Sequence, residues 1–210
     1  VADEVAPHLI LMGPHRWQFH DMFVGTKAER IIQRAGRPVL VANAVPAADY
    51  ERTLLAIDFD EASRSAIQSV KGMEFLRRSR MTAIHLFDTP AAGLMRRAMD
   101  GSDAIAEYTA HEALNAGARF GRFLSAAGLL RVEHLLRPQE GPPGRALALR
   151  AQLHDADLVV VGTNQRTGVQ RIVLGSVAKD VVTSAKCDVL VIPAVTNPGL
   201  PVRPNVRLSA

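Results

Sequence analysis

The stretch that decides the fold is Leu158-Val-Val-Val-Gly162-Thr-Asn-Gln165-Arg166-Thr-Gly168-Val-Gln-Arg171-Ile-Val-Leu-Gly175-Ser176-Val177. Its first residues form a continuous apolar run, which is typical of a parallel strand covered on both faces. A glycine-rich loop follows, and Gly175 precedes a segment with helical character. Loop amides and a helix N-terminus direct N–H groups at one point, so this order favours an anion-binding site.

A diverged copy of this stretch lies near the start of the chain, offset by 149 to 150 residues. The strand corresponds to Leu9-Ile-Leu-Met-Gly13, and the helix begins at Gly25-Thr26. The match continues to Val39-Leu-Val41, which aligns with Val189-Leu-Val191. A period of this length indicates a repeated domain rather than a solenoid unit. Of the first copy, we identify only the last two strands and the helix between them.

Composition excludes several functional classes. The 210 residues are 48% hydrophobic and carry a formal net charge of +4, with scattered basic residues. No block of Lys and Arg with interleaved aromatic residues occurs, so we expect no nucleic-acid partner. No apolar run approaches about 18 residues and no leader pattern opens the chain, so we expect neither a membrane span nor a signal peptide. Cys187 is the single cysteine, which favours a reducing compartment and a cytoplasmic location.

Strand-like and helix-like patterns alternate along the chain. Strands are predicted at 9–12, 39–42, 53–58, 82–87, 131–136, 157–162 and 189–192. Helices are predicted at 25–35, from Pro143 to about His154, and at 176–185. Another helix is predicted to begin after a cap at Asp60, with one face formed by Ala62, Ala66, Val70 and Met73. A further helix is predicted from a face that comprises Ala106, Ala110, Ala113, Phe120, Phe123 and Ala127. Residues 88–103 are predicted as a long loop because of Pro90, Gly93 and Gly101. This order predicts an α/β fold with a doubly wound, Rossmann-like parallel sheet.

These residues resemble the universal stress protein family. Its signature is Gly, two residues, Gly, nine residues and Gly-Ser/Thr after the fourth strand, which Gly162 and Gly175-Ser176 reproduce. Gln165 replaces the second glycine. The segments Thr53–Asp58 and Cys187–Pro193 resemble the first and last strands of the family. The resemblance implies the adenine nucleotide alpha hydrolase-like fold, with a partial domain at 1–45, a linker at 46–50, a complete domain at 51–195 and an extended tail at 196–210.

The resemblance also implies a nucleotide site. It assigns ATP or a related adenine nucleotide, with Mg²⁺ as an accompanying ion, to Asp58, Val161, Gly162, Gln165, Arg166, Gly175, Ser176 and Val177. Gly168 and Arg171 are further candidates for the same loop. The protein would then be a stress-response regulatory module, at most a slow ATPase. Two alternatives remain: a nucleotide-free interaction module of the same fold, which the side chain at Gln165 favours, and an enzyme related to the adenylate-forming folds.

Other reactive residues favour structural roles. His15, His20 and Asp21 do not share a helical face, so we predict no metal site. Cys187 heads a buried-type strand, which indicates a packed thiol. Ser63 and Ser65 lack a nucleophile elbow, so no catalytic residue is predicted. Trp17, Phe19 and Phe23 are expected to pack rather than to stack on a ligand.

The two copies of the last strand predict self-association. The resemblance implies pairing of Val39–Ala42 with Val189–Ile192, because an uncovered apolar edge promotes aggregation. The partial copy is too small to bury a core alone, so we expect its open side to recruit further strands and the chain to form a dimer or larger species.

Overall fold

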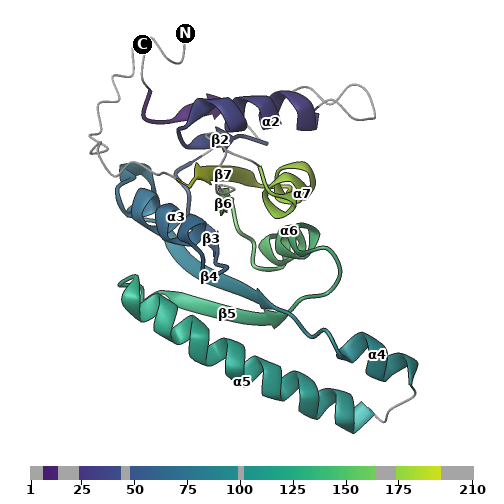
Figure 1. Ribbon diagram of the computed structural model, residues 1–210. Helices are drawn as coiled ribbons and strands as arrows, with labels where there is room; N and C mark the ends of the chain where they lie inside the picture. Colours follow the sequence, from purple (N-terminus) through teal and green to yellow (C-terminus); the bar gives the residue numbers. More distant parts are fainter. Residues whose placement is uncertain (1–6, 14–23, 44–47, 99–101, 164–173, 195–210) are drawn as a thin grey trace.

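A computed structural model describes residues 7–13, 24–43, 48–98, 102–163 and 174–194. Within these residues the strands form one seven-stranded sheet in the order β1-β2-β7-β6-β3-β4-β5 (Figure 1). The strands are β1 (Ile10–Met12), β2 (Val39–Val41), β3 (Arg52–Ala56), β4 (Arg80–Phe87), β5 (Glu133–Pro138), β6 (Leu158–Thr163) and β7 (Asp188–Pro193). All neighbours are parallel except β2 and β7. The predicted doubly wound α/β fold is therefore confirmed.

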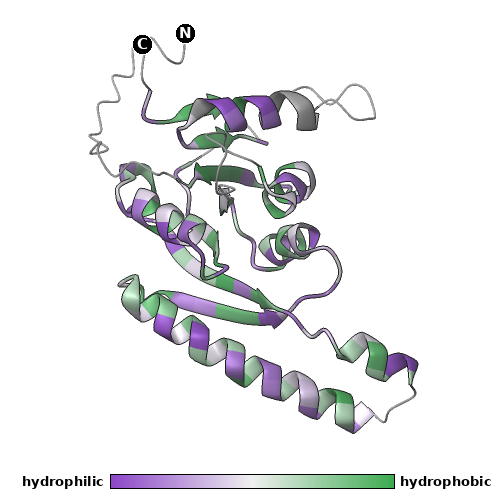
Figure 2. Cartoon of the chain, viewed as in Figure 1, coloured by the Kyte–Doolittle hydropathy of each residue, from purple (hydrophilic) through white to green (hydrophobic). Residues whose placement is uncertain are grey.

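Two hydrophobic layers cover the sheet, one on each face. The helices are α2 (Val24–Ala35), α3 (Glu61–Lys71), α4 (Ala92–Arg97), α5 (Ser102–Ala126), α6 (Pro143–Leu153) and α7 (Ser176–Ser184), with a 3-10 turn η1 at Glu74–Leu76. Helices α2, α6 and α7 pack on one face through residues such as Ile32, Leu147 and Val181. Helices α3 and α5 pack on the other through residues such as Ile67 and Phe120. Figure 2 shows the resulting apolar centre and the polar outer sides of the helices.

Strand alternation explains how both layers form from so few residues. In β6, Val159 and Val161 face the layer with α6 and α7, whereas Leu158 and Val160 face the layer with α3 and α5. All four side chains are at most 2% exposed. A strand buried on both faces has to be apolar at every position, as the opening stretch of the sequence indicated.

The segment predicted as a long loop, 88–103, contains structure. Helix α4 occupies Ala92–Arg97 and α5 already begins at Ser102, so this prediction is wrong. Pro90 precedes α4, and Gly93 lies within its first turn, where glycine is tolerated at a modest cost. The backbone N–H of Ala91 donates to the hydroxyl of Tyr108 (3.3 Å), which ties α4 to α5.

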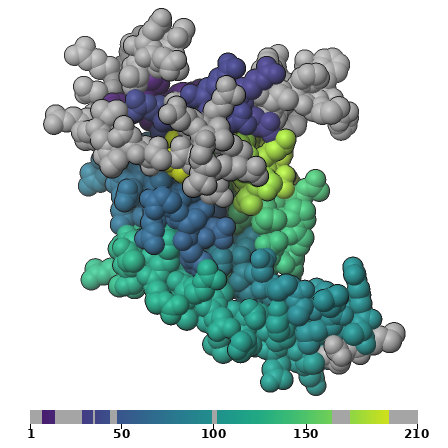
Figure 3. Space-filling view, in the orientation of Figure 1, coloured from purple at the N-terminus to yellow at the C-terminus, as the bar shows by residue number. Residues whose placement is uncertain are grey.

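The expected buried face of α5 is only partly correct. Phe120 and Phe123 are buried, but Ala106 and Ala110 are exposed. Figure 3 shows the reason, because α4 and the first half of α5 project from the body of the molecule. The third strand of the complete unit also runs two residues later than predicted, at Glu133–Pro138.

The N-terminal repeat completes the far edge of the sheet. Strand β1 runs parallel to β2, and β2 lies antiparallel to β7 with Leu40 opposite Leu190. The domain boundaries and the association of this chain with a second copy stay predictions. None of the helices in the described part of the chain has the length and apolar character needed to cross a bilayer.

Candidate functional site

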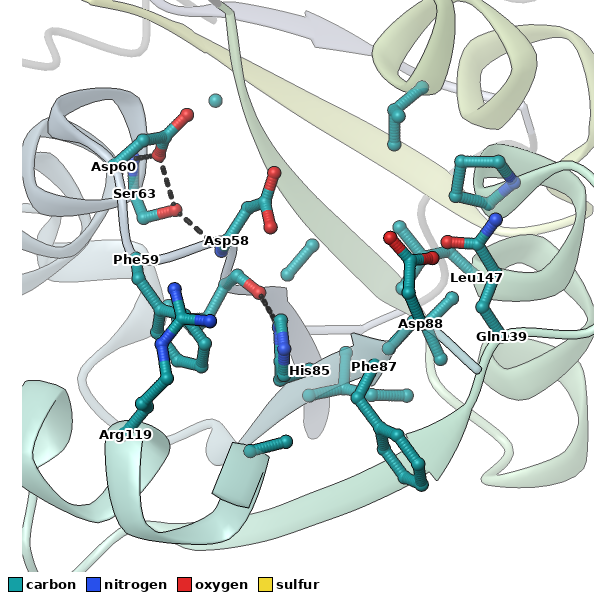
Figure 4. Close-up of a pocket in the computed structure, with 18 of the residues that line it drawn as sticks. Asp58, Phe59, Asp60, Ser63, His85, Phe87, Asp88, Arg119, Gln139 and Leu147 are labelled. Atoms are coloured by element: carbon teal, nitrogen blue, oxygen red, sulfur yellow. Dashed lines mark hydrogen bonds between the residues drawn. The ribbon is translucent and has the colours of Figure 1, made fainter. Parts of the chain in front are cut away.

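A cavity of about 470 Å³ opens at the carboxyl ends of β3, β4 and β6 (Figure 4). Strand β3 lies between β4 and β6, so the chain leaves β3 toward one side of the sheet and later returns on the other. This is the topological switch point, where open α/β sheets bind ligands. The described walls come from the ends of β3, β4 and β6 and from helices α3, α5, α6 and α7.

The turn from β3 to α3 positions the carboxylate of Asp58. Asp60 is the N-cap of α3 and accepts hydrogen bonds from the Ser63 N–H (2.8 Å) and the Ser63 hydroxyl (2.7 Å). The Ser63 oxygen in turn accepts from the Asp58 N–H (2.9 Å). These bonds fix the backbone of the turn and leave the Asp58 carboxylate free toward the cavity (Figure 4).

Asp58 has an altered acidity. Its side chain reaches solvent through the mouth of the cavity, yet protein atoms surround part of the carboxylate. This partial burial raises the pKa of Asp58, and the nearby negative charge of Asp60 adds to the effect. The carboxylate can accept hydrogen bonds from a hydroxyl or amino group of a ligand.

A stack of three side chains forms the floor of the cavity. The ring centres of His85 and Phe59 lie 4.1 Å apart with the rings tilted by 42°, and the Arg119 guanidinium carbon lies 5.0 Å from the ring centre of Phe59. Phe59 has a φ of +57°, in the left-handed region that bulky residues rarely adopt. Such a conformation costs about 1–3 kcal/mol and persists where surrounding packing fixes it, often at functional sites.

His85 has an altered basicity. Burial lowers its pKa, and the hydrogen bond between its Nδ1 and the carbonyl oxygen of Ile57 (2.8 Å) opposes this shift in part. Because a carbonyl only accepts hydrogen bonds, Nδ1 carries the proton and donates it. Sequence reasoning missed His85, Phe59 and Arg119; a histidine within the apolar segment Ala83-Ile-His-Leu-Phe87 was the available signal.

The structure separates the predicted site residues into three groups. Asp58, Val161, Gly162 and Val177 line the cavity. Gly175 and Ser176 do not line it; Gly175 is the N-cap of α7 and Ser176 is its exposed first residue. Gln165 and Arg166, like Gly168 and Arg171, lie outside the described residues. The assignment of these residues to a nucleotide stays a prediction.

The two described signature glycines have different surroundings. A Cβ atom added at Gly162 would lie 2.8 Å from the carbonyl carbon and oxygen of Ala62 in α3. Among the described residues, a Cβ atom at Gly175 would meet nothing within 4 Å. Close packing of β6 on α3 therefore explains Gly162 without any ligand, whereas packing within the described part of the chain does not explain Gly175.

The remaining candidates have structural surroundings where they are described. Burial raises the pKa of the Cys187 thiol to about 11, so the reactive thiolate is scarce at neutral pH. The Ser65 hydroxyl donates to the carbonyl of Pro193 (3.1 Å). No group of three metal-ligating side chains occurs among the described residues. His15, His20, Asp21, Trp17, Phe19 and Phe23 lie outside them.

Comparisons with known proteins agree with this architecture. The sequence model of the Universal stress protein family matches residues 49–193. Universal stress protein MJ0531 of Methanocaldococcus jannaschii is 33% identical over 134 residues, which cover 63% of this chain and 73% of that protein. Universal stress protein MJ0577 of the same organism is 22% identical over 156 residues, covering 68% and 94%.

A solved structure matches more of the chain. The crystal structure of a universal stress protein from Archaeoglobus fulgidus DSM 4304 superposes with a TM-score of 0.60 at 17% identity. The superposition covers 92% of this chain and 65% of that one, so this chain spans about two thirds of the matched protein. Residues 49–210, which follow the N-terminal repeat, make up less than 92% of the chain. The superposition therefore also includes part of the N-terminal repeat. The family match and the 33% identical relative together show that this chain belongs to the universal stress protein family.

Proposed function

We propose that this protein is a cytoplasmic regulatory module that binds ATP or a related adenine nucleotide at the end of the sheet. The observation that carries the proposal is the cavity at the carboxyl ends of β3, β4 and β6. Its volume of about 470 Å³ lies within the range of small-molecule sites, about 300–1,000 Å³. The proposal assigns no enzymatic role beyond slow, incidental hydrolysis of ATP.

The charges in the cavity indicate how the nucleotide lies. Asp58, Asp60, Asp88 and Glu112 line the described wall, with Arg119 as its cationic side chain. These carboxylates suit the amino group of adenine and the hydroxyls of ribose, but they repel phosphate. The phosphates therefore lie toward the start of α7, whose Val177 lines the cavity and whose first amides favour an anion.

A nucleotide-free interaction module is the second candidate. The packing of Gly162 against Ala62 favours it, because the fold already requires this signature glycine without a ligand. The two candidates differ at Gly175, which packing within the described residues does not explain. They also differ at Gln165, since its side chain would obstruct the approach of phosphate only if phosphate binds there.

Calorimetric titration with ATP, with and without Mg²⁺, tests the proposal. Gly175→Val adds a branched side chain that meets none of the described residues within 4 Å at its Cβ atom, so the variant is expected to fold and to lose at least tenfold in affinity, about 1.4 kcal/mol. Gly121→Val is the matched control, because a Cβ atom there also meets none of the described residues within 4 Å and α5 packs on the opposite face of the sheet from α7.

Three outcomes separate the candidates. Unchanged affinity in folded Gly175→Val would place ATP elsewhere. Gln165→Gly is expected to raise the affinity, and an equal or lower value would show that Gln165 is no obstacle. If the parent protein binds no ATP at millimolar concentration, and mass spectrometry finds no ligand in the purified protein, the nucleotide-free module is correct.

A further inference from the structure

The junction between β2 and β7 is symmetric in its backbone. Leu40 pairs with Leu190, Val39 with Val191 and Val41 with Val189. The repeat equates Val39, Leu40 and Val41 with Val189, Leu190 and Val191, so exchanging the two repeats leaves this register unchanged. A local two-fold axis passes through the Leu40–Leu190 pair. By backbone alone, β7 of a second chain could take the place of β2.

One ion pair breaks this symmetry. Glu29 in α2 and Lys179 in α7 occupy equivalent positions of the repeat. The Lys179 Nζ lies 2.7 Å from Glu29 Oε1, which makes an ion pair between the two helices. The Glu29 carboxylate raises the pKa of Lys179. If β7 paired with a second β7, Lys179 would face another Lys179, and attraction would become repulsion.

A buried carboxylate breaks the symmetry a second time. Asp188 is only 6% exposed, and its Oδ1 accepts the backbone N–H of Asn43 (2.7 Å). The Asn43 side-chain amide also donates to the carbonyl of Cys187 (2.7 Å). The repeat equates Asn43 with Pro193, which has no backbone N–H. In a β7–β7 pair, Asp188 would keep the hydroxyl of Tyr50 (2.5 Å) but lose this backbone donor.

We propose that the β7 edge is a selective docking surface for the N-terminal repeat, residues 9–43, and rejects a second β7. Glu29 and Asn43 are the specificity-determining residues of the repeat, and Lys179 and Asp188 are their partners on the complete domain. Selectivity of this kind combines an attractive contact with a repulsive one against the wrong partner. Any assembly of two chains then leaves the β2–β7 junction intact.

Cross-linking of the unaltered full chain tests which residues meet. A carbodiimide activates a carboxylate, and a neighbouring amine then attacks it to form an amide. We expect a Glu29–Lys179 cross-linked peptide. An amine-to-amine reagent applied to a mixture of ¹⁴N- and ¹⁵N-labelled chains should give no mixed-isotope Lys179–Lys179 peptide. Recovery of that mixed peptide, or the absence of the Glu29–Lys179 amide, would overturn the proposal.

Charge reversal measures how much the ion pair between Glu29 and Lys179 stabilises the junction. Glu29→Lys and Lys179→Glu should each lower the folding equilibrium constant about two- to fivefold, the range for a partly exposed pair, and the double variant should recover most of the loss. Arg122→Glu is the control, since it reverses an exposed charge on α5. When it is combined with Glu29→Lys, the effects of the two changes on the free energy of unfolding should simply add. A charge-reversed pair whose two losses simply add would refute the role of the ion pair.

Substitutions at Asn43 test the second contact. Asn43→Ala keeps the backbone N–H that Asp188 accepts, whereas Asn43→Pro removes it and mimics Pro193. We expect a larger drop in the urea midpoint for proline than for alanine. Equal drops would show that the backbone donor does not contribute to selectivity. If Asn43→Pro fails to fold, Asp188→Ala in a Tyr50→Phe background removes the acceptor of the same bond, and its drop should also exceed that of Asn43→Ala. An equal drop would refute the role of this bond.

Discussion

Replacing Gly162 by alanine tests whether packing or a ligand requires this glycine. The added Cβ atom would lie 2.8 Å from the carbonyl carbon and oxygen of Ala62 and 2.9 Å from its Cβ atom. Ordinary contacts between carbon atoms are about 3.5–4.0 Å, so β6 and α3 would have to separate by more than half an ångström. The obstructing atoms include backbone atoms, which cannot rotate away. We expect a loss of about 1–3 kcal/mol in the free energy of unfolding, the usual cost of overpacking.

Urea denaturation without nucleotide, followed by circular dichroism, measures this loss. Gly175→Ala is the matched control, because its Cβ atom meets none of the described residues within 4 Å and its φ of −62° and ψ of 159° suit alanine. It should be neutral, or stabilising by up to about 1 kcal/mol through the unfolded state. In thermal unfolding the expected difference for Gly162→Ala is about 2–4 °C per kcal/mol. If both variants were equally stable, the packing explanation of Gly162 would be refuted.

Three further predictions concern the cap of α3, a buried histidine and a buried thiol. Asp60→Ala should lower the free energy of unfolding by about 1 kcal/mol in urea, because the N-cap of α3 is lost, while Asp60→Asn retains most of it; equal losses would contradict a capping role. Burial lowers the pKa of folded His85, so the unfolded chain binds more protons and stability should fall as pH drops below about 6.5. His85→Gln should reduce the slope of the urea midpoint against pH between 7.5 and 5. An unchanged slope would show that other groups cause the loss of stability at low pH. Cys187, with its pKa raised to about 11, should react with a disulfide reagent at pH 8 about two orders of magnitude more slowly than an unfolded control; a comparable rate would show that the thiol is exposed.

The sequence alone determined the layers of the molecule. The apolar run Leu158–Val161 predicted a strand buried on both faces, because every position of such a strand contacts a hydrophobic layer. The Asp60 cap and the glycine at 175 predicted where α3 and α7 begin. These signals are local, since a few consecutive residues settle backbone conformation and periodicity. The projecting half of α5 was not predictable in this way, because Ala106 and Ala110 have helical spacing whether or not the sheet reaches them.

Tertiary structure alone decided what the cavity contains and which residues meet across the repeats. His85, Phe59 and Arg119 come from β4, the β3–α3 turn and α5, and only the folded chain stacks them. The spacing of Gly162 and Gly175 in the signature did not reveal that Gly162 packs against Ala62 while Gly175 has no close neighbour among the described residues. From the sequence, Glu29 and Lys179 are only equivalent positions of the two repeats. The antiparallel junction of β2 and β7 brings their side chains into contact. Such contacts join residues far apart in the chain, so they depend on how the elements pack rather than on the pattern within any one of them.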